Sequence, residues 1–593
     1  MAGTGHLRIG EYGTGTLTVS GGLVTNRICY MAMNAGSVAT VNVSSGTWAT
    51  NGDLNIGYGG TGTLNVSGGM VTNTYCYMGN GDPSTQGTAM ITGGTWANSG
   101  DLYVGYYDSP GTLTITGGIV TVGGILETGT GGTINIGTGG TTGVLLGGTG
   151  NVTNNGTLVF NRSDAVTYSG TISGAGAVTK QGANTLTLSG NNSYTGDTRA
   201  AAGTLALGGV NAIAGSTLDM NASDSSGVAF TVAGIRTYIV GGLKGSRDLA
   251  IGGNTLSVGS NGQSTTYAGS LSGTGALAKA GAGTLTLSGS NSYTAGTTIS
   301  AGVLALGSAN AVGTSGTIRF GGGTQQYSAS NTTDYSSRFS TAASQAYKID
   351  TNGQDVTFAS PLTNLGGSLT KSGAGTLTLA GANSYSGPTT ISGGVLALSG
   401  TGSIGTGDLN LGTTGSPGGL DIAGLTAGSY SLPAAASLTG AGTLSGSGKA
   451  LAVLGSLLPG NSPGTVALGS GFTLDLSSSG TSVFEITDPA YTAGTYDLVS
   501  GDGSVVFGGI LNLAFSGGSY ADGTDVLQIF AATGGRSGNF SAVNATGLAA
   551  GQSATFNPTT GFITVVPEPS TYAMALAGLA CGGYSMFRRR RAC

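Results

Sequence analysis

Hydrophobic and polar residues alternate in short runs along most of the chain, and these runs recur. The segment Gly15–Gly22 reads Gly-Thr-Leu-Thr-Val-Ser-Gly-Gly, and close copies stand at Gly62–Gly69 and Gly111–Gly118. Weaker copies lie halfway between them, which gives a repeating unit of about 24 residues. Strict alternation places Leu, Val and Ile on one face of a strand and Thr, Ser and Asn on the other. The pattern therefore predicts short strands, each with one apolar face, joined by glycine corners.

Units of this length cannot bury an apolar face alone, so they have to stack on one another. Strands that stack in parallel about 4.8 Å apart and are joined by short turns form a β-solenoid. We therefore predict an all-β parallel solenoid for residues 1–165, with apolar side chains inside and hydroxyl and amide side chains outside.

The composition narrows the class of protein further. Glycine accounts for 118 of 593 residues, charged residues for 7%, and the formal net charge is -5. The glycines show no three-residue period, which excludes collagen, and the many β-branched residues disfavour disorder. Gly, Thr, Ser and Asn also weaken helices. No basic stripe is present that would suit nucleic acid, so we expect no nucleic-acid partner.

A second family of repeats follows the first. Each copy begins with a lysine, continues through a Thr-Leu-Thr-Leu strand and reaches an Asn-Ser-Tyr segment; the copies are Lys180–Gly196, Lys279–Thr294 and Lys371–Gly387. They closely resemble the autotransporter-associated β-strand repeat. The resemblance covers about residues 170–210, 270–310 and 365–400, and it implies a right-handed parallel β-helix. We take 166–450 as one such β-helical region.

The sequence pattern changes near residue 451, where the predicted strands become longer and carry more charge. The segment 451–565 resembles the module that often follows such repeats. We predict a β-rich cap, formed either by a sandwich or by the last distorted turns of the solenoid. A cap has a physical purpose, because the open end of a solenoid is an unpaired sheet edge that invites aggregation.

The tail 566–593 has three parts: a short motif, an apolar run over 571–587 and a basic stop. The motif consists of Val566, Pro567, Glu568, Pro569 and Ser570, and the stop consists of Arg588, Arg589, Arg590 and Arg591. The apolar run is at the lower limit for a spanning helix, which needs ~17–25 residues. The arginines are expected to stay cytoplasmic, which places the preceding chain on the other side of the membrane.

This tail closely resembles the PEP-CTERM sorting signal of Gram-negative bacteria. The resemblance implies an exosortase-type membrane protease as a transient partner, which removes the tail and transfers or releases the protein. It also implies an exported protein of the cell envelope, cell surface or extracellular matrix, anchored in the membrane before processing. An ordinary C-terminal membrane anchor is the alternative.

The first residues of the sequence lack the signal that export requires. Residues 1–5 have neither a basic region nor an apolar core, so they form no secretory signal. His6–Gly10 matches Asp53–Gly57 and Asp101–Gly105, and the chain therefore begins inside a repeat. We expect that the native N-terminus, with its signal peptide, is missing from this sequence.

Residues able to carry catalysis or to bind a metal are few. His6 is the sole histidine, and a nucleophile–histidine site needs a base in place. Cys29 and Cys76 occupy equivalent repeat positions two rungs apart, which is about 9.6 Å and exceeds the ~7 Å limit for a disulfide. We expect both to be small buried residues. The sequence predicts no catalytic residue, no metal site and no cofactor.

Two aromatic residues also recur, in Thr47-Trp48-Ala49 and Thr95-Trp96-Ala97. Stacked along one face they would suit a sugar ring, but we expect them to pack in the core or at a corner. Threonine pairs recur as well, as in Thr16-x-Thr18, and a regular hydroxyl array suits ice. Against ice binding, the pairs do not occupy consecutive rungs, and the intervening rungs vary.

Many parallel β-helices cleave polysaccharides, which requires placed carboxylates. The acids of the solenoid are scattered singly, among them Asp197, Asp219 and Asp224. Asp53 and Asp101 do align, and we expect them to cap turns. The sequence therefore favours a non-enzymatic structural or adhesive surface protein that contacts matrix polysaccharide. A carbohydrate-active lyase or hydrolase and an ice-binding protein stay open as alternatives; the enzyme would need three acids and a Lys or Arg converging in one groove.

Overall fold

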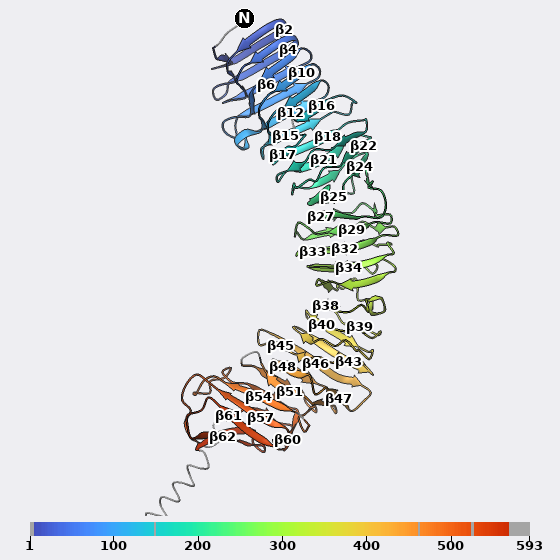
Figure 1. The fold of residues 1–593 in the computed structure, drawn as a ribbon, viewed down its shortest axis with the longest axis vertical. Coiled ribbons are helices and arrows are strands. Elements are labelled where there is room, and N and C mark those ends of the chain that lie inside the picture. Colours follow the sequence, from blue (N-terminus) through green and yellow to red (C-terminus); the bar gives the residue numbers. More distant parts are fainter. Residues whose placement is uncertain (1–4, 148–149, 461–462, 479, 524–526, 568–593) are drawn as a thin grey trace, which may run out of the picture. The chain divides into compact units, whose positions relative to one another are not determined.

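The computed structural model describes residues 5–147, 150–460, 463–478, 480–523 and 527–567 (Figure 1). The chain divides into two compact units, residues 1–317 and residues 318–593, which we describe separately. In each unit, equivalent strands of successive turns lie side by side and pair in parallel (Figure 1). The predicted fold is confirmed: the protein is an all-β parallel β-solenoid of the right-handed type.

A rung of unit 1 is built from three short strands. One rung consists of β8 (Tyr75–Met78), β9 (Gln86–Ile91) and β10 (Thr95–Asn98). The next consists of β11 (Leu102–Val104), β12 (Gly111–Ile115) and β13 (Ile119–Val122). Each strand pairs in parallel with its equivalent in the next rung. Equivalent residues of successive rungs therefore form columns, with one side chain per rung.

The inward columns make the core of unit 1. One column runs in register through Val41, Leu64, Ala89, Leu113, Ile134 and Leu158, all 0% exposed. Burying one such Leu or Ile side chain contributes about 1.5–3 kcal/mol to stability. Because side chains alternate along a strand, the Thr and Asn residues between these positions face outward, as the sequence pattern predicts.

The lysine-led repeats add a buried polar group to this design. In the second copy, Lys279 is 1% exposed, and its ammonium donates hydrogen bonds to the carbonyls of Ala280 (2.5 Å), Gly281 (2.9 Å) and Ala301 (3.2 Å). Lys180 and Lys371 make the equivalent three bonds. Each ammonium thus joins the corners of two neighbouring rungs, because the third carbonyl belongs to the next rung.

Unit 2 continues the same architecture. One of its runs of paired strands consists of β39 (Val356–Phe358), β41 (Thr376–Leu379), β43 (Val395–Gly400), β46 (Ser416–Leu425), β49 (Gly442–Ser445), β52 (Thr465–Leu468), β55 (Leu498–Gly501) and β59 (Phe530–Ala532). The parallel pairing passes residue 450 and reaches β61 (Ala542–Thr546), which pairs with β57 (Ile510–Phe515). The described residues of 451–546 therefore form further rungs of the solenoid, the second of the two forms considered above. The boundaries at 165, 450 and 565 stay predictions.

The last described strands pair differently. β58 (Leu527–Gln528) and β62 (Gln552–Asn557) each pair antiparallel with β63 (Phe562–Pro567). Beneath them, Phe507 contacts the rings of Phe530, Phe540 and Phe556 at 4.9–5.3 Å between centroids. An antiparallel hairpin over an aromatic cluster does not propagate the parallel ladder, so it can close this end of unit 2.

The predicted sorting tail falls mostly outside the described residues. Val566 and Pro567 are the last residues of β63, in register with Ser553 and Gln552. Glu568, Pro569, Ser570, the apolar run 571–587 and the four arginines 588–591 lie outside the described ranges. Within those ranges, no helix is both long and apolar enough to cross a membrane. The predicted transmembrane helix is therefore not supported by the described part of the chain.

Candidate functional site

Tyrosines gather on one outer face of unit 1. Alternation along β8 and β11 turns Cys76 and Leu102 inward and the adjacent Tyr77 and Tyr103 outward. The two tyrosines are in register on neighbouring strands. Their rings stack with centroids 5.4 Å apart and planes only 4° from parallel. The solenoid ladder itself thus builds an aromatic stack.

The corner after β11 adds two more rings. A 3-10 turn, η1 (Tyr106–Asp108), places the Tyr106 ring 5.0 Å from Tyr103 and 4.2 Å from Tyr107. Tyr107 (φ 52°) and Asp108 (φ 61°) both have left-handed backbone, which is strained for residues other than glycine. Together Tyr77, Tyr103, Tyr106 and Tyr107 form what we call the tyrosine cluster. Strain of this kind concentrates at functional sites, so the turn marks a candidate.

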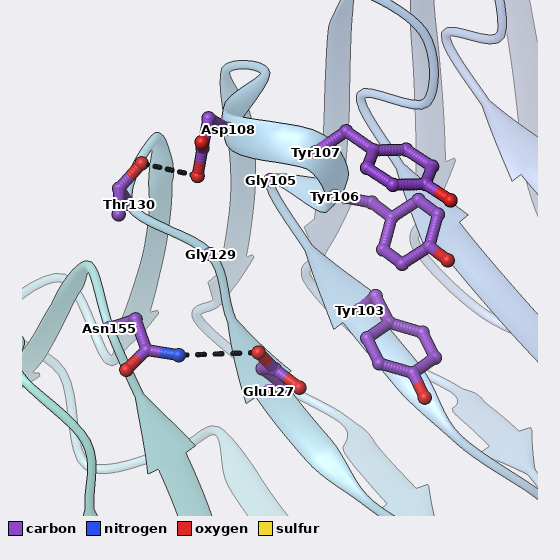
Figure 2. A pocket seen from close by; sticks show the side chains of 9 residues that line it. All are labelled: Tyr103, Gly105, Tyr106, Tyr107, Asp108, Glu127, Gly129, Thr130 and Asn155. Carbon is purple, nitrogen blue, oxygen red and sulfur yellow. Dashed lines mark hydrogen bonds between the residues drawn. The ribbon is translucent and has the colours of Figure 1, made fainter.

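A pocket of about 210 Å³ opens beside this cluster. Figure 2 shows Tyr103, Tyr106 and Tyr107 along one side and polar pairs along the other. Thr130 donates a hydrogen bond to Asp108 (2.6 Å), and the Asn155 amide donates one to Glu127 (3.2 Å). The described residues that line the pocket include no lysine or arginine. Its polar wall is therefore acidic and rich in hydrogen-bonding groups.

The backbone of the pocket also depends on glycine. Gly129 lies so close to the carbonyl of Gly105 that a Cβ at this position would collide with it. The corner of β14 (Leu126–Thr128) can therefore approach the preceding corner only without a side chain. This close approach shapes the floor between the two polar pairs.

The pKa values of the Tyr103 and Tyr106 phenols are raised. Burial, reinforced by the Asp101 carboxylate, raises the pKa of Tyr103. A hydrogen bond with Tyr107, together with burial, raises the pKa of Tyr106 to about 12. Neutral phenols both donate and accept hydrogen bonds. Aromatic faces beside hydroxyl, amide and carboxylate groups can bind a sugar, which offers C–H faces and hydroxyls. Among the described residues, no group of three or more His, Cys, Asp and Glu side chains is placed to hold a metal ion.

The predicted tryptophan and cysteine positions are buried. Trp48 and Trp96 are both 0% exposed, and their indole N–H groups donate to Asn26 (2.9 Å) and Asn73 (2.7 Å). The packing interpretation is confirmed, and a sugar contact through these rings is wrong. Cys29 and Cys76 are buried free thiols, and burial raises the pKa of both. Leu54 lies between them in the column, which confirms their two-rung separation.

The threonine columns differ from the expectation. At the first position of the pair, the intervening rungs do not vary: Thr16, Thr40, Thr63, Thr88, Thr112, Thr133 and Thr157 are in register on successive strands. The second position does vary, through Thr18, Asn42, Asn65, Met90, Thr114, Asn135 and Val159. Paired hydroxyls are therefore not in register over adjacent rungs of this face, which is the array that ice binding needs.

Three acids that the sequence shows as scattered converge in the fold. Asp224 pairs with Arg199 (2.7 Å) and Arg247 (4.0 Å), while Lys244 pairs with Asp197 and, at 3.8 Å, with Asp219. Burial raises the pKa of Asp219. This corrects the expectation of single acids, because parallel stacking brings residues of three rungs into one cluster. Each of the three carboxylates faces a cation, so the group forms an ion-pair network.

Asp101 and His6 both lie outside the core. Asp101 accepts a hydrogen bond from the Ile125 N–H (2.8 Å) at the corner of the next rung and not within its own turn. The turn cap at Asp53 stays a prediction. His6 lies on the outer face near Tyr30, with ring centroids 6.0 Å apart. The tyrosine cluster was missed by the sequence reasoning. The signal was present, because Tyr77 and Tyr103 occupy equivalent repeat positions, and Tyr107 and Asp108 stand where the earlier corner has Gly59 and Gly60.

Comparison with known proteins finds the repeats that the sequence pattern predicts. Residues 178–207, 277–306 and 369–398 match the Passenger-associated-transport-repeat model. These stretches coincide with the three predicted repeats, which are therefore confirmed. The chain is also 31% identical over 228 residues to the adhesin BmaC autotransporter of Brucella suis biovar 1 (strain 1330), which covers 35% of this chain and 6% of that protein. The chain thus spans only a small part of the length of this relative.

Proposed function

We propose that the protein is an exported, surface-associated adhesive β-solenoid that contacts extracellular polysaccharide and catalyses no reaction. The observation that carries the proposal is the pocket between the tyrosine cluster and its acidic wall, on the outer face of a solenoid. The passenger-type repeats and the similarity to an adhesin support it. A solenoid offers a long regular surface, and such surfaces are commonly used for binding.

The adhesive role is tested with cells of the native host. Cells that carry the full chain are expected to be retained on matrix polysaccharide, and cells deleted for it are expected to wash off. Re-expression of the full chain should restore retention. Equal retention of deleted and wild-type cells would contradict the proposal.

Sorting by an exosortase-type protease is the second part of the proposal. Its support is the order of the tail, in which Val566–Ser570 precedes an apolar run and Arg588–Arg591. The protein would be anchored in the membrane until the tail is removed. Mass spectrometry of the mature C-terminus from native cells tests this. The proposal expects the arginines to be absent, and their retention in every molecule would contradict it.

The enzyme alternative has one observation in its favour. Asp197 and Asp219 converge on Lys244, in the same network as Asp224 and its partner Arg247. The purified full chain is incubated with neutral and uronate-containing polysaccharides, and the new reducing ends are measured. The adhesive proposal expects no turnover. Turnover by the wild type that disappears in Lys244→Met would contradict the adhesive proposal and support the enzyme alternative.

A further inference from the structure

We propose that the pocket at the tyrosine cluster is a saccharide subsite that holds one uncharged sugar unit of a glycan lying along this face. The inference rests on the proposed function and names the ligand class and the residues for it. The pocket of about 210 Å³ is smaller than the ~300 Å³ at which sites for drug-sized ligands begin, so it suits a single sugar unit.

The stacking geometry decides where the sugar binds. Tyr77 covers one face of the Tyr103 ring. On the other side, the residue in register with Tyr103 is Glu127. The second face of Tyr103 therefore looks across the pocket toward Glu127 and its partner Asn155 (Figure 2). A sugar ring on that face would place its C–H groups against the aromatic ring, and its hydroxyls within reach of carboxylate and amide.

The carboxylates of the polar wall disfavour an anionic ligand. Asp108 and Glu127 line the pocket, and Asp101 accepts a hydrogen bond from the Tyr103 hydroxyl (3.3 Å). The described lining contributes no compensating cation. An anionic sugar such as a uronate would meet the carboxylates of Asp108 and Glu127, whereas the hydroxyls of a neutral sugar can donate to them. The charge distribution therefore points to an uncharged glycan.

The aromatic surface extends beyond the pocket along the same sheet. Tyr30 is in register with Tyr77, with Asn55 between them. Two rungs separate these tyrosines by about 9.6 Å. The Tyr58 ring packs edge-on against Tyr30 at 5.1 Å. A glycan that leaves the pocket in this direction would meet further tyrosines on the outer face.

The side chains of the site hold one another in place. The hydroxyl of Thr130 and the amide of Asn155 hold the two carboxylates, and the strained turn holds Tyr106 against Tyr103 and Tyr107 against Tyr106. A preformed site loses little side-chain freedom on binding. Binding is therefore expected without rearrangement of the backbone.

Calorimetric titration of the full chain tests the inference with named probes. These are cellohexaose, mannohexaose and hexa-N-acetylchitohexaose as neutral glycans, hexagalacturonate as the anion, and choline as a competing ligand for an aromatic site. At least one neutral hexasaccharide is expected to bind. Neither hexagalacturonate nor choline is expected to bind. Tyr103→Thr and Tyr107→Ala should each weaken binding about three- to ten-fold. Tyr12→Thr, an exposed tyrosine outside the lining, should leave it unchanged.

The variant Glu127→Gln removes the charge of this side chain and keeps its shape. It should keep binding of the neutral glycan within about three-fold and admit some hexagalacturonate. Preference for hexagalacturonate or choline in the wild type overturns the inference, as does undiminished binding by both tyrosine variants. If no glycan binds while cells carrying the chain still adhere, this inference fails and the proposed function stands. If the deleted cells adhere equally, the proposed function fails whatever the titration shows.

Discussion

Tyrosine serves opposite purposes in the N-terminal rungs and in the lysine-led repeats. Tyr103 and Tyr107 face outward, and Tyr107 is 69% exposed. In the repeats, Tyr194, Tyr293 and Tyr385 are fully buried, and each shares a hydrogen bond with a threonine hydroxyl, as between Tyr293 and Thr297 (2.7 Å). The N-terminal rungs expose their tyrosines, and the repeats use theirs as core.

The two regions also differ in the polar groups of their interior. Beside their aliphatic columns, the N-terminal rungs bury uncharged amides, among them Asn26, which accepts a hydrogen bond from the Trp48 indole. Each repeat buries a lysine, an asparagine and a tyrosine. In the second copy, the lysine and the asparagine donate hydrogen bonds to the next rung, and Tyr293 shares one with Thr297, four residues further along the chain. Buried polar groups tolerate little change, because an unsatisfied partner costs free energy. We infer that the repeats supply stability and register, and the N-terminal rungs supply contact.

The largest expected effect comes from truncating a buried tyrosine. Tyr385→Ala should lower the free energy of unfolding by about 3–5 kcal/mol, because it leaves a cavity and an unpaired Thr389 hydroxyl. Tyr103→Thr should cost less than about 1 kcal/mol, because the ring lies on the surface and threonine suits a strand. Denaturant unfolding of the full chain measures both. Similar losses for the two variants would break the comparison.

Removing a buried lysine should have a smaller but clear effect. Lys371→Met should destabilise the strands around β40 (Ser368–Ser372) by about 2–3 kcal/mol, because three carbonyls lose their donor. Lys348→Met is the matched control, since Lys348 donates to the Gly322 carbonyl and is half-buried. Hydrogen exchange of the backbone amides in these strands reports the loss. An equal effect in both variants would show that the third repeat does not depend on its lysine.

The smallest expected effect is the change with pH in the contribution of Lys371 to stability. Burial lowers the pKa of Lys371 from 10.5 to about 8. Between these pH values the unfolded chain binds more protons than the folded chain, so the contribution of Lys371 to stability rises with pH. The stability difference between wild type and Lys371→Met should therefore grow from pH 8 to pH 10. A difference that shrinks over this window would contradict the burial of the ammonium.

Much of the fold follows from the sequence because the repeats show it directly. Alternation in Gly62–Gly69 predicts the inward Leu64 and Val66, and the spacing of Cys29 and Cys76 predicts two rungs. Passage of the parallel ladder through 451–546 was left open, since longer charged strands suit a sandwich equally well. Local pattern identifies strands, but the direction in which distant strands pair depends on the whole fold.

The candidate site was less accessible to sequence reasoning. The tyrosine cluster depends on a left-handed corner at Tyr107 and Asp108, and no local rule predicts that bulky residues occupy such backbone. The network around Lys244 joins residues of different rungs, which requires the register between them. Trp48 was compatible with core or surface until the partner of its indole N–H was known.

Chemical modification tests the division between contact tyrosines and core tyrosines most directly. The full chain is nitrated with tetranitromethane, with and without the neutral hexasaccharide that binds best, and the modified tyrosines are mapped by mass spectrometry. We expect modification at Tyr107 and Tyr103 that the glycan suppresses, and none at Tyr194, Tyr293 or Tyr385 until the chain unfolds. Nitration of the repeat tyrosines in the folded protein, or no protection at Tyr107 and Tyr103, would contradict the account.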